Sequence, residues 1–311
     1  MYCNLNINVS LLGIYFLYNH LLCYNFSMNI ADLHIHSNNS DGSDSVETLV
    51  KELQKANVRI FALTDHDTIA GCVEIKKYIP ENIKFIPSIE LTCQTDDIKC
   101  HILGFNCNPS DKKLNALIQK GKDLRRKKLE TRLDYIKNIL HIDLTQEELN
   151  WLYSRKSVVK THLANLLVKR KMTKTNVEAM QKYLDGIKTG NTRFSIEEAL
   201  DAIVTSGGTP VWAHPLGGEG EKHITHEKFI TRLGKMIAYG IKGLECYYSR
   251  YTYEEAKFLI DCATSNNLLI SGGSDYHGTN KENIQLAKLN VDSTPIDAKK
   301  LTILNPYSSS L

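Results

Sequence analysis

Side chains that can bind metal ions recur in short clusters along the chain. Asp32, His34 and His36 alternate within one short, otherwise apolar segment. Alternate residues of a β-strand point to the same face, so these three side chains are predicted to lie on one side. The later clusters are Ser40-Asp41-Gly42, Thr64-Asp65-His66-Asp67, Glu90, His101, Ala213-His214-Pro215 and Ser274-Asp275-Tyr276-His277-Gly278.

The mixture of imidazole and carboxylate groups indicates which metals could bind. Imidazole nitrogen and carboxylate oxygen together suit Zn, Mn and Fe, whereas an all-oxygen set would suit Mg or Ca. The clusters offer more ligands than one tetrahedral site needs. We therefore expect two or three divalent ions per chain, with Mn²⁺ as the first choice and Fe²⁺ or Zn²⁺ as alternatives. Two ions about 3.5–4 Å apart can activate water and hold both oxygens of a phosphoryl transfer.

A single histidine is more often a surface or core residue than a ligand, so grouping is what makes these histidines informative. Six of the eleven histidines fall in the clusters above. The other histidines are expected to be structural, with a reservation for His162, and they are His20, His141, His162, His223 and His226.

Apolar β-type runs alternate with amphipathic helical runs after Met28. Strands are predicted at residues 29–36, 59–64, 83–91, 98–105, 209–213, 241–247 and 268–272. Helices are predicted at residues 46–56, 69–78, 195–204, 227–239 and 252–265. Repeated strand–helix units predict a parallel sheet, open or closed. In a closed (β/α) barrel, chemistry lies where strands end, and the polar clusters fall at those ends.

Helix starts carry recognisable capping patterns. Ser195 with Glu198, Thr252 with Glu255 and Asp44 with Glu47 are spaced as capping boxes, and Thr68 could cap the helix at 69–78.

The stretch from Leu114 to about Lys188 shows helical periodicity and dense charge but no good strand pattern. We expect residues 114–188 to be a helical insertion in a barrel formed by residues 29–113 and 189–311. Each charge could equally belong to a solvated helix face. The cations of its first part are Lys120, Lys122, Arg125, Arg126, Lys127, Lys128, Arg132 and Lys137.

Bulk composition is that of an ordinary globular protein. Hydrophobic residues make up 42% of the 311 residues, and the formal charge of +3 gives no global argument for nucleic-acid or membrane binding. The eight cysteines contain no C-x-x-C pair, which excludes a zinc ribbon and a thioredoxin-type motif. Reduced thiols and a cytoplasmic location are the expectation.

The first 28 residues match no targeting pattern well. Leu11 to Tyr24 is fairly apolar, but no Lys or Arg precedes it, and Asn19 and His20 interrupt it. We expect a disordered or loosely packed extension, or a segment upstream of a true start at Met28. A membrane anchor is the lesser alternative.

The clusters resemble those of the PHP family, named for polymerase and histidinol phosphatase. The matching segments occur in the family's order and span residues 30 to about 280. They are D-L-H-I-H-S-N-N-S-D-G (32–42), L-T-D-H-D-T (63–68), I-E (89–90), H-I-L-G-F (101–105), A-H-P (213–215) and G-S-D-Y-H-G (273–278).

The resemblance implies a distorted (β/α)7 TIM-like barrel with a trinuclear metal centre at its strand ends. Glu90 would bridge the ions. The remaining ligands would be His34, His36 and Asp275 for one ion, His101 and His214 for a second, and Asp41, His66 and His277 for a third.

Within the family, the chain is similar to the branch that acts on nucleotides, which includes nucleoside 3′,5′-bisphosphate phosphatases and 5′→3′ exoribonucleases. That branch carries Arg-Pro-His in the insertion, where this chain has Lys160-Thr161-His162. The cation and the histidine are kept, but the guanidinium fork is lost, which affects phosphate affinity and the choice of substrate. A polymerase proofreading role is not expected, because polymerase domains are absent.

The resulting hypothesis is a phosphoesterase that uses metal-activated water on nucleotides or on the 5′ ends of short RNA. It would form no stable nucleic-acid complex and contact no membrane. A phosphatase of a small metabolite, such as histidinol phosphate, is the first alternative, and a non-catalytic binding module is the second. Asp67 and His277 are candidate proton-transfer groups. The candidate substrate contacts are Arg125, Arg126, Arg132, Lys160, His162 and Arg193.

Overall fold

The computed structural model describes residues 29–95, 97–190, 193–218 and 222–305. The predictions for residues 1–28 therefore lie outside the described residues. The strands are β1 (Ile30–Asp32), β2 (Val58–Leu63), β3 (Lys84–Gln94), β4 (Lys99–Phe105), β5 (Thr209–Ala213), β6 (Gly243–Tyr248) and β7 (Leu269–Gly273). The α-helices are α2 (Val46–Lys55), α3 (Ala70–Glu74), α4 (Lys112–Asn138), α5 (Gln146–Tyr153), α6 (Lys160–Lys169), α7 (Asn176–Ala179), α8 (Ile196–Thr205), α9 (His226–Tyr239) and α10 (Tyr253–Ser265).

The strands form one sheet in chain order, and its two ends come together as a nearly closed barrel. Leu33 N donates to Gly272 O at 3.2 Å, and Asp275 N donates to His34 O at 2.8 Å. Ile35 forms a parallel bridge with Tyr276 just beyond the two edge strands. The predicted distorted (β/α)7 barrel is confirmed.

The prediction of a wholly parallel sheet is wrong for one strand. β4 runs antiparallel to both β3 and β5, whereas the other neighbouring pairs are parallel. Only residues 95–98 connect β3 to β4, and a connection this short can join antiparallel strands but cannot make a parallel crossover. The first residues of β4 therefore lie at the end of the barrel where β3 and β5 finish.

Two of the four predicted helix caps are confirmed, and Thr68 contacts the start of its helix only by accepting from Ala70 N at 3.3 Å. The capping boxes of α8 (Ser195 with Glu198) and α10 (Thr252 with Glu255) are confirmed. The cap of α2 is Ser45 rather than Asp44, because Ser45 Oγ accepts from Thr48 N at 3.1 Å. The predicted helix at 69–78 is the short α3 followed by a 3-10 turn, and Ile69 occupies its N-cap without a side-chain bond.

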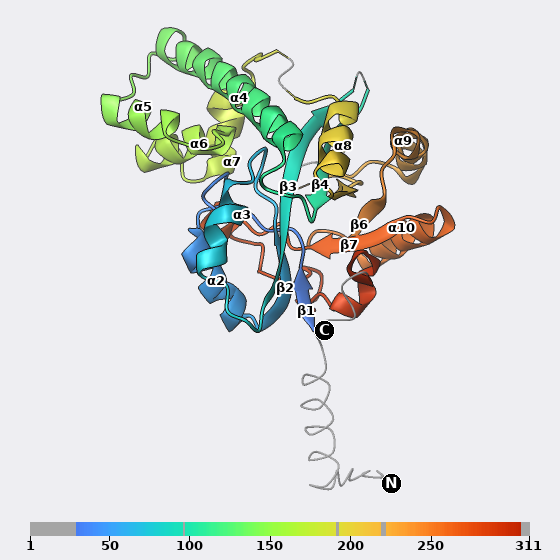
Figure 1. Cartoon of the computed structure of the whole chain (residues 1–311). Coiled ribbons are helices and arrows are strands. Elements are labelled where there is room, and N and C mark those ends of the chain that lie inside the picture. Colours follow the sequence, from blue (N-terminus) through green and yellow to red (C-terminus); the bar gives the residue numbers. More distant parts are fainter. Residues whose placement is uncertain (1–28, 96, 191–192, 219–221, 306–311) are drawn as a thin grey trace, which may run out of the picture.

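Helices α4 to α7 gather at the upper left of Figure 1, beside the upper part of β3. They share a core of their own that includes Leu129, Ile136, Leu152, Leu163 and Leu167. The first turns of α4 instead pack on the barrel core through Leu114, Leu117 and Ile118. The insertion is thus anchored by one long helix, and the rest of it lies over the strand ends.

Two simple properties concern the described residues as a whole. Each described cysteine is free, namely Cys72, Cys93, Cys100, Cys107, Cys246 and Cys262. No helix in this part of the chain combines the length and the apolar character that crossing a membrane would require.

Candidate metal centre

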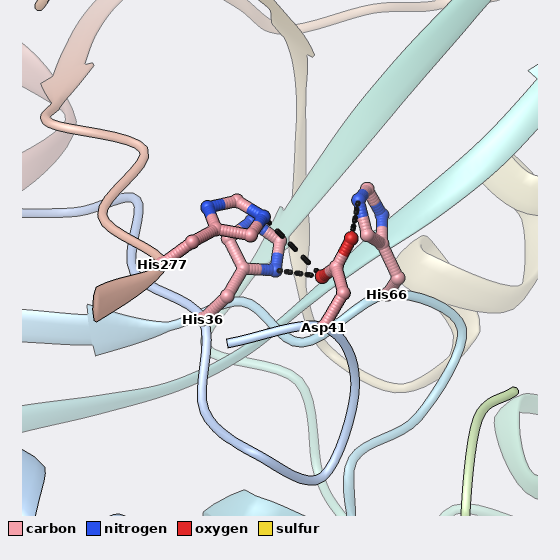
Figure 2. Close-up of side chains that lie close together, drawn as sticks. All are labelled: His36, Asp41, His66 and His277. Atoms are coloured by element: carbon pink, nitrogen blue, oxygen red, sulfur yellow. Dashed lines mark ion pairs between the residues drawn. The ribbon is translucent and has the colours of Figure 1, made fainter. Parts of the chain in front are cut away.

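The residues named as candidate ligands converge on one site at the end of the barrel. Figure 2 shows Asp41 between His66 on one side and His36 and His277 on the other. Asp41 Oδ1 lies 3.3 Å from His277 Nε2, and Asp41 Oδ2 lies 3.7 Å from His66 Nε2. A second group joins His34, His36 and Asp275, and a third joins His66, Glu90 and His101. His214 completes the set, with Nε2 3.3 Å from Glu90 Oε1.

Glu90 occupies the middle of the centre and contacts imidazoles on β4 and in the segments that follow β1, β2 and β5. Its Oε2 lies 3.4 Å from His34 Nε2, 3.2 Å from His36 Nε2 and 3.0 Å from His66 Nδ1. Its Oε1 lies 2.9 Å from His101 Nδ1. Burial alone would raise the pKa of Glu90, but the imidazoles of His66, His101 and His34 outweigh burial and hold the pKa well below its usual value. Glu90 is therefore a carboxylate.

His101 reaches this centre from the beginning of its strand, not from its end. It is the third residue of β4, and it lies opposite Thr92 of β3 and Ala213 of β5. The prediction that the ligands lie at strand C-termini is wrong for His101. The antiparallel direction of β4 brings it to the correct end of the barrel.

Several buried polar atoms at the centre have no hydrogen-bond partner. They are His34 Nε2, His36 Nε2, His66 Nδ1, Asp41 Oδ1 and Glu90 Oε2. Buried polar atoms are nearly always paired, because leaving one unpaired loses its solvation without return. Imidazole nitrogens and carboxylate oxygens that face one another are the donor set that Mn, Fe or Zn ions use. The residues present thus fit a group of bound divalent cations.

Glycine permits the close approach of the segments that carry two of these histidines. A Cβ on Gly273 would overlap the backbone and Cβ of His34, and a Cβ on Gly42 would overlap the carbonyl of His36. Both glycines stand inside the motifs, next to Ser274-Asp275 and Asp41.

Glu245 of β6 contacts two of the candidate ligands, and the sequence analysis missed it. Its Oε1 lies 2.8 Å from His34 Nδ1, and its Oε2 accepts from His214 N at 2.7 Å. The side chain is fully buried. In the sequence, Glu245 could have been recognised as the one carboxylate inside an otherwise apolar strand, Gly-Leu-Glu-Cys-Tyr-Tyr.

Other polar residues hold the ligand-bearing loops. Asp65 accepts from Ser37 N at 2.8 Å and from Ser40 Oγ at 2.6 Å, which fixes the loop leading to Asp41. Asp275 Oδ2 accepts from Tyr248 OH at 2.9 Å and from Lys281 Nζ at 2.7 Å. Such contacts orient metal ligands and are part of how a protein tunes a metal site.

Asp67, a candidate proton-transfer group, has both carboxylate oxygens engaged. Oδ1 accepts from Thr92 N at 2.8 Å, and Oδ2 accepts from Arg125 Nε at 2.8 Å and also contacts the Arg125 Nη2 group. These contacts favour a role in orienting Arg125, and proton transfer by Asp67 stays a prediction. The other candidate, His277, lies within the cluster of Figure 2, and its Nδ1 is 2.8 Å from Asp275 O.

The six candidate substrate contacts do not all lie together. The charges of Arg125, Arg132 and Arg193 act on Lys128, which was not among the predicted contacts. Burial first, and then the charges of Arg125, Arg193 and Arg132, lower the pKa of Lys128 to about 7.

His162 lies close to the metal centre, and Lys160 lines a cavity beside it. The His162 ring interacts with the Ser40 backbone and the Asp41 charge, and burial lowers its pKa to about 4. Lys160 forms an ion pair with Asp185.

Arg126 is exposed, and its guanidinium stacks over Tyr153 at 5.5 Å, so the structure does not bring it to the centre. Of the histidines expected to be structural, His223 pairs with Glu255 at 2.6 Å and His226 stacks on Phe258. His20 lies outside the described residues.

The chain matches the PHP domain model over residues 32–246. It is 30% identical over 251 residues to a 5′-3′ exoribonuclease of Haemophilus influenzae, which covers 79% of this chain and 89% of that protein. It is 26% identical to a 3′,5′-nucleoside bisphosphate phosphatase of Chromobacterium violaceum (79% and 86% covered). It is 25% identical to a phosphoribosyl 1,2-cyclic phosphate 1,2-diphosphodiesterase of Eggerthella lenta (80% and 94%).

Two solved structures share the fold. One, from Bifidobacterium adolescentis and assigned as a metal-dependent phosphoesterase, superposes with a TM-score of 0.75 at 24% identity over 87% of this chain and 93% of that one. The other is an amidohydrolase from Chromobacterium violaceum with bound sulfate, with a TM-score of 0.72 at 24% identity over 81% and 88%. The domain model matches more than half of this chain. The chain therefore belongs to the PHP family and is a phosphoesterase, a hydrolase of phosphoester bonds.

Proposed function

We propose that the chain hydrolyses phosphoesters of nucleotides that carry a second phosphate, namely nucleoside 3′,5′-bisphosphates and the 5′ ends of short RNA. The observation that carries this proposal is the group of cations beside the metal centre, Arg125, Lys128, Arg132 and Arg193 (the α4 cation cluster). The names of the relatives from Haemophilus influenzae and Chromobacterium violaceum support the same substrate class.

The α4 cation cluster adjoins the metal centre through β3. Thr92 follows Glu90 by two residues, so both side chains lie on one face of the strand. Thr92 Oγ1 and Asp67 hold the Arg125 guanidinium. Phe194 N donates to Thr92 O at 3.0 Å, which places Arg193 beside the same part of β3. A substrate phosphate at the centre would thus have a second anion site within reach.

The charge balance of the cluster favours an anion. Burial and three neighbouring guanidinium groups lower the pKa of Lys128, and Asp67 is the carboxylate that opposes them. A second phosphate would add negative charge and bidentate acceptors for arginine. A substrate with one phosphate, bound at the metal centre, would bring no second anion to this cluster.

We propose the ligand set that the sequence analysis gave. Glu90 would bridge, His34, His36 and Asp275 would hold one ion, Asp41, His66 and His277 a second, and His101 with His214 a third. Bound divalent ions, with Mn²⁺ expected, would supply activated water and neutralise charge on the phosphoryl group. Glu245, Asp65 and Tyr248 hold the ligand side chains and loops in position.

We further propose that residues 114–188 act as a substrate cap on a barrel formed by residues 29–113 and 189–311. His162 and Lys160 belong to this cap and face the side of the centre that carries Asp41. A cytoplasmic location remains a prediction from cysteine usage.

Phosphate release with Mn²⁺ tests the proposal. The substrates are adenosine 3′,5′-bisphosphate, a 5′-phosphorylated oligoribonucleotide (assayed by product length) and histidinol phosphate. We expect kcat/KM for the nucleotides to exceed that for histidinol phosphate by at least about tenfold. This factor corresponds to the free energy of one hydrogen bond to a charged group, which histidinol phosphate would not form. Preference for histidinol phosphate would establish the small-metabolite alternative, and no turnover on any nucleotide would refute the proposal.

A further inference from the structure

A basic opening adjoins the metal centre on the side of His101 and His214. It is a cavity of about 90 Å³ that both imidazoles line, together with Lys99, Arg193, Lys222 and Arg232. Among the lining residues that the structure describes, none is acidic. The site thus brings four cationic side chains and two candidate metal ligands to one small cavity.

Four different segments of the chain supply these cations. Lys99 precedes His101 by two residues on β4, so the antiparallel direction of that strand brings it to the ligand end of the barrel. Arg232 lies on α9, and its Nη2 is 3.4 Å from the carbonyl oxygen of Asp97. The Asp97 carboxylate is paired with Lys235 instead. The charge of Asp97 is therefore balanced by Lys235.

The side of the metal centre that carries Asp41 and His277 has a different character. Asp41 and His277 line a cavity of about 370 Å³ together with Lys160, Asp185, Asn176 and Asn280. Its charges are mixed, and its amides can donate and accept hydrogen bonds. Asp185 also interacts with the charge of Arg132, so this cavity lies close to the α4 cation cluster.

The two cavities differ in what they can hold. Small-molecule sites typically occupy about 300–1,000 Å³, so the larger cavity can take a nucleoside and the basic opening cannot. The basic opening suits a phosphate group, because its described lining offers cations without a competing carboxylate. The substrate would therefore have a direction, with the nucleoside on the Asp41 side and further phosphates on the His101 side.

The bond that breaks in the proposed substrates determines which part of the substrate lies on each side of the metal centre. In a 3′,5′-bisphosphate and in RNA cut from its 5′ end, water adds its oxygen to phosphorus and the P–O3′ bond breaks. The O3′ atom leaves with a proton in both cases. The difference is that the phosphorus of RNA also carries O5′ of the next nucleotide. That strand must leave the metal centre on the side away from the departing nucleoside.

We infer that the basic opening binds the RNA strand on the 3′ side of the scissile phosphate, and that the chain therefore prefers 5′-phosphorylated oligoribonucleotides to mononucleotide bisphosphates. This inference rests on the proposed function. Lys99, Lys222 and Arg232 contact backbone phosphates that a mononucleotide does not have. Such contacts release counterions, so they strengthen binding most at low salt.

The test compares the double variant Lys99→Gln/Arg232→Gln with the wild type and with Lys228→Gln. Lys228 is an exposed cation on α9, one turn before Arg232, and it does not line the opening. The substrates are adenosine 3′,5′-bisphosphate and 5′-phosphorylated oligoribonucleotides of two, three and five nucleotides. We expect the double variant to lose about tenfold or more in kcat/KM on the pentanucleotide and less than about twofold on the bisphosphate.

A binding measurement makes the result independent of turnover. Fluorescence anisotropy of a 3′-labelled, 5′-phosphorylated pentanucleotide is recorded in EDTA over a range of salt concentrations. The slope of log K against log salt should fall by about 0.7 for each phosphate contact that the variant loses. Lys228→Gln should keep the wild-type slope. The single variant Lys99→Gln, at an exposed residue, replaces the double variant if melting temperatures show that the latter is unfolded.

The outcomes separate this inference from the proposed function. A wild-type kcat/KM on the bisphosphate as high as that on the longer oligoribonucleotides would overturn the inference. That result would leave the proposed function intact. Equal losses on all substrates, or an unchanged salt slope, would also overturn it. If the wild type hydrolysed no nucleotide at all, the proposed function would fail, and the inferred preference would fail with it.

Discussion

Glu245 Oε1 lies 2.8 Å from His34 Nδ1, and both side chains are fully buried. A carboxylate can only accept, so His34 Nδ1 carries the proton and its Nε2 faces the centre. Glu245 Oε2 accepts from the backbone N of His214, a residue with a φ of 28°. One side chain of β6 therefore orients candidate ligands at the ends of β1 and β5.

Replacement of Glu245 should weaken metal binding. Glu245→Gln keeps the size of the side chain but removes the charge that orients His34, and such contacts typically change metal affinity or activity by about 10–100-fold. Metal content after purification and a Mn²⁺ titration would measure the effect. Glu254→Gln, at an exposed position in the first turn of α10, is the control. Wild-type metal affinity in Glu245→Gln would show that this contact does not position a ligand.

Two adjacent arginines should behave differently. Arg125→Gln removes the guanidinium that Asp67 and Thr92 hold beside the metal centre, whereas Arg126→Gln removes one that stacks on Tyr153. A hydrogen bond to a charged group contributes roughly 1.5–3 kcal/mol, so Arg125→Gln should lower kcat/KM on adenosine 3′,5′-bisphosphate about 10–100-fold. Arg126→Gln should stay within about twofold. Equal losses of kcat/KM in the two variants would contradict the proposal that the α4 cation cluster binds the second phosphate.

The low pKa of Lys128 predicts a pH-dependent KM. Burial, and then Arg125, Arg193 and Arg132, lower this pKa from 10.5 to about 7. The ammonium is therefore present below pH 7 and lost above it. The second phosphate is already ionised in that range, so KM for adenosine 3′,5′-bisphosphate should rise between pH 7 and 9.

Lys128→Arg keeps its charge throughout this range and should remove most of the rise in KM. Adenosine 3′-phosphate, which has no second phosphate, is the control substrate and should show no difference between the wild type and this variant. If the wild type and Lys128→Arg gave parallel KM profiles on the bisphosphate, the titrating group would be another residue.

Removal of metal should reduce both activity and stability. The centre holds buried imidazole and carboxylate atoms without hydrogen-bond partners, so bound cations would stabilise the folded chain. Ligand at a hundred times its Kd stabilises by about 2.7 kcal/mol, which corresponds to a melting-temperature shift of about 4 °C for a chain of this size. Calorimetry after EDTA treatment, and again after Mn²⁺ addition, measures the shift. Identical melting curves would argue against structural coupling of the metal to the fold.

The residue types and order of the candidate ligands could be predicted from the sequence because each motif is local. His34 and His36 share a face through strand alternation, and Ser195 with Glu198 caps a helix through bonds within one turn. The positions of the strands and helices could be predicted for the same reason. Where local signals competed, as at Asp44 and Ser45, the prediction shifted by a residue.

Contacts between distant segments were beyond the reach of such patterns. The sequence does not distinguish Arg125 from Arg126, because the rotation of α4 on the barrel decides which one meets Asp67. It contains no spacing rule for Glu245, whose partners lie 211 and 31 residues away. Such contacts depend on how elements pack, and packing is a property of the whole chain.

The sequence by itself determined the family, the barrel and the kinds of atom that meet at its end. The tertiary structure decided the direction of β4, and with it the placement of His101 and Lys99 beside His214. It also decided which cations gather at α4. Local hydrogen bonding and side-chain periodicity are encoded within a few residues, whereas strand direction and helix rotation are set by burial against segments far away in the chain.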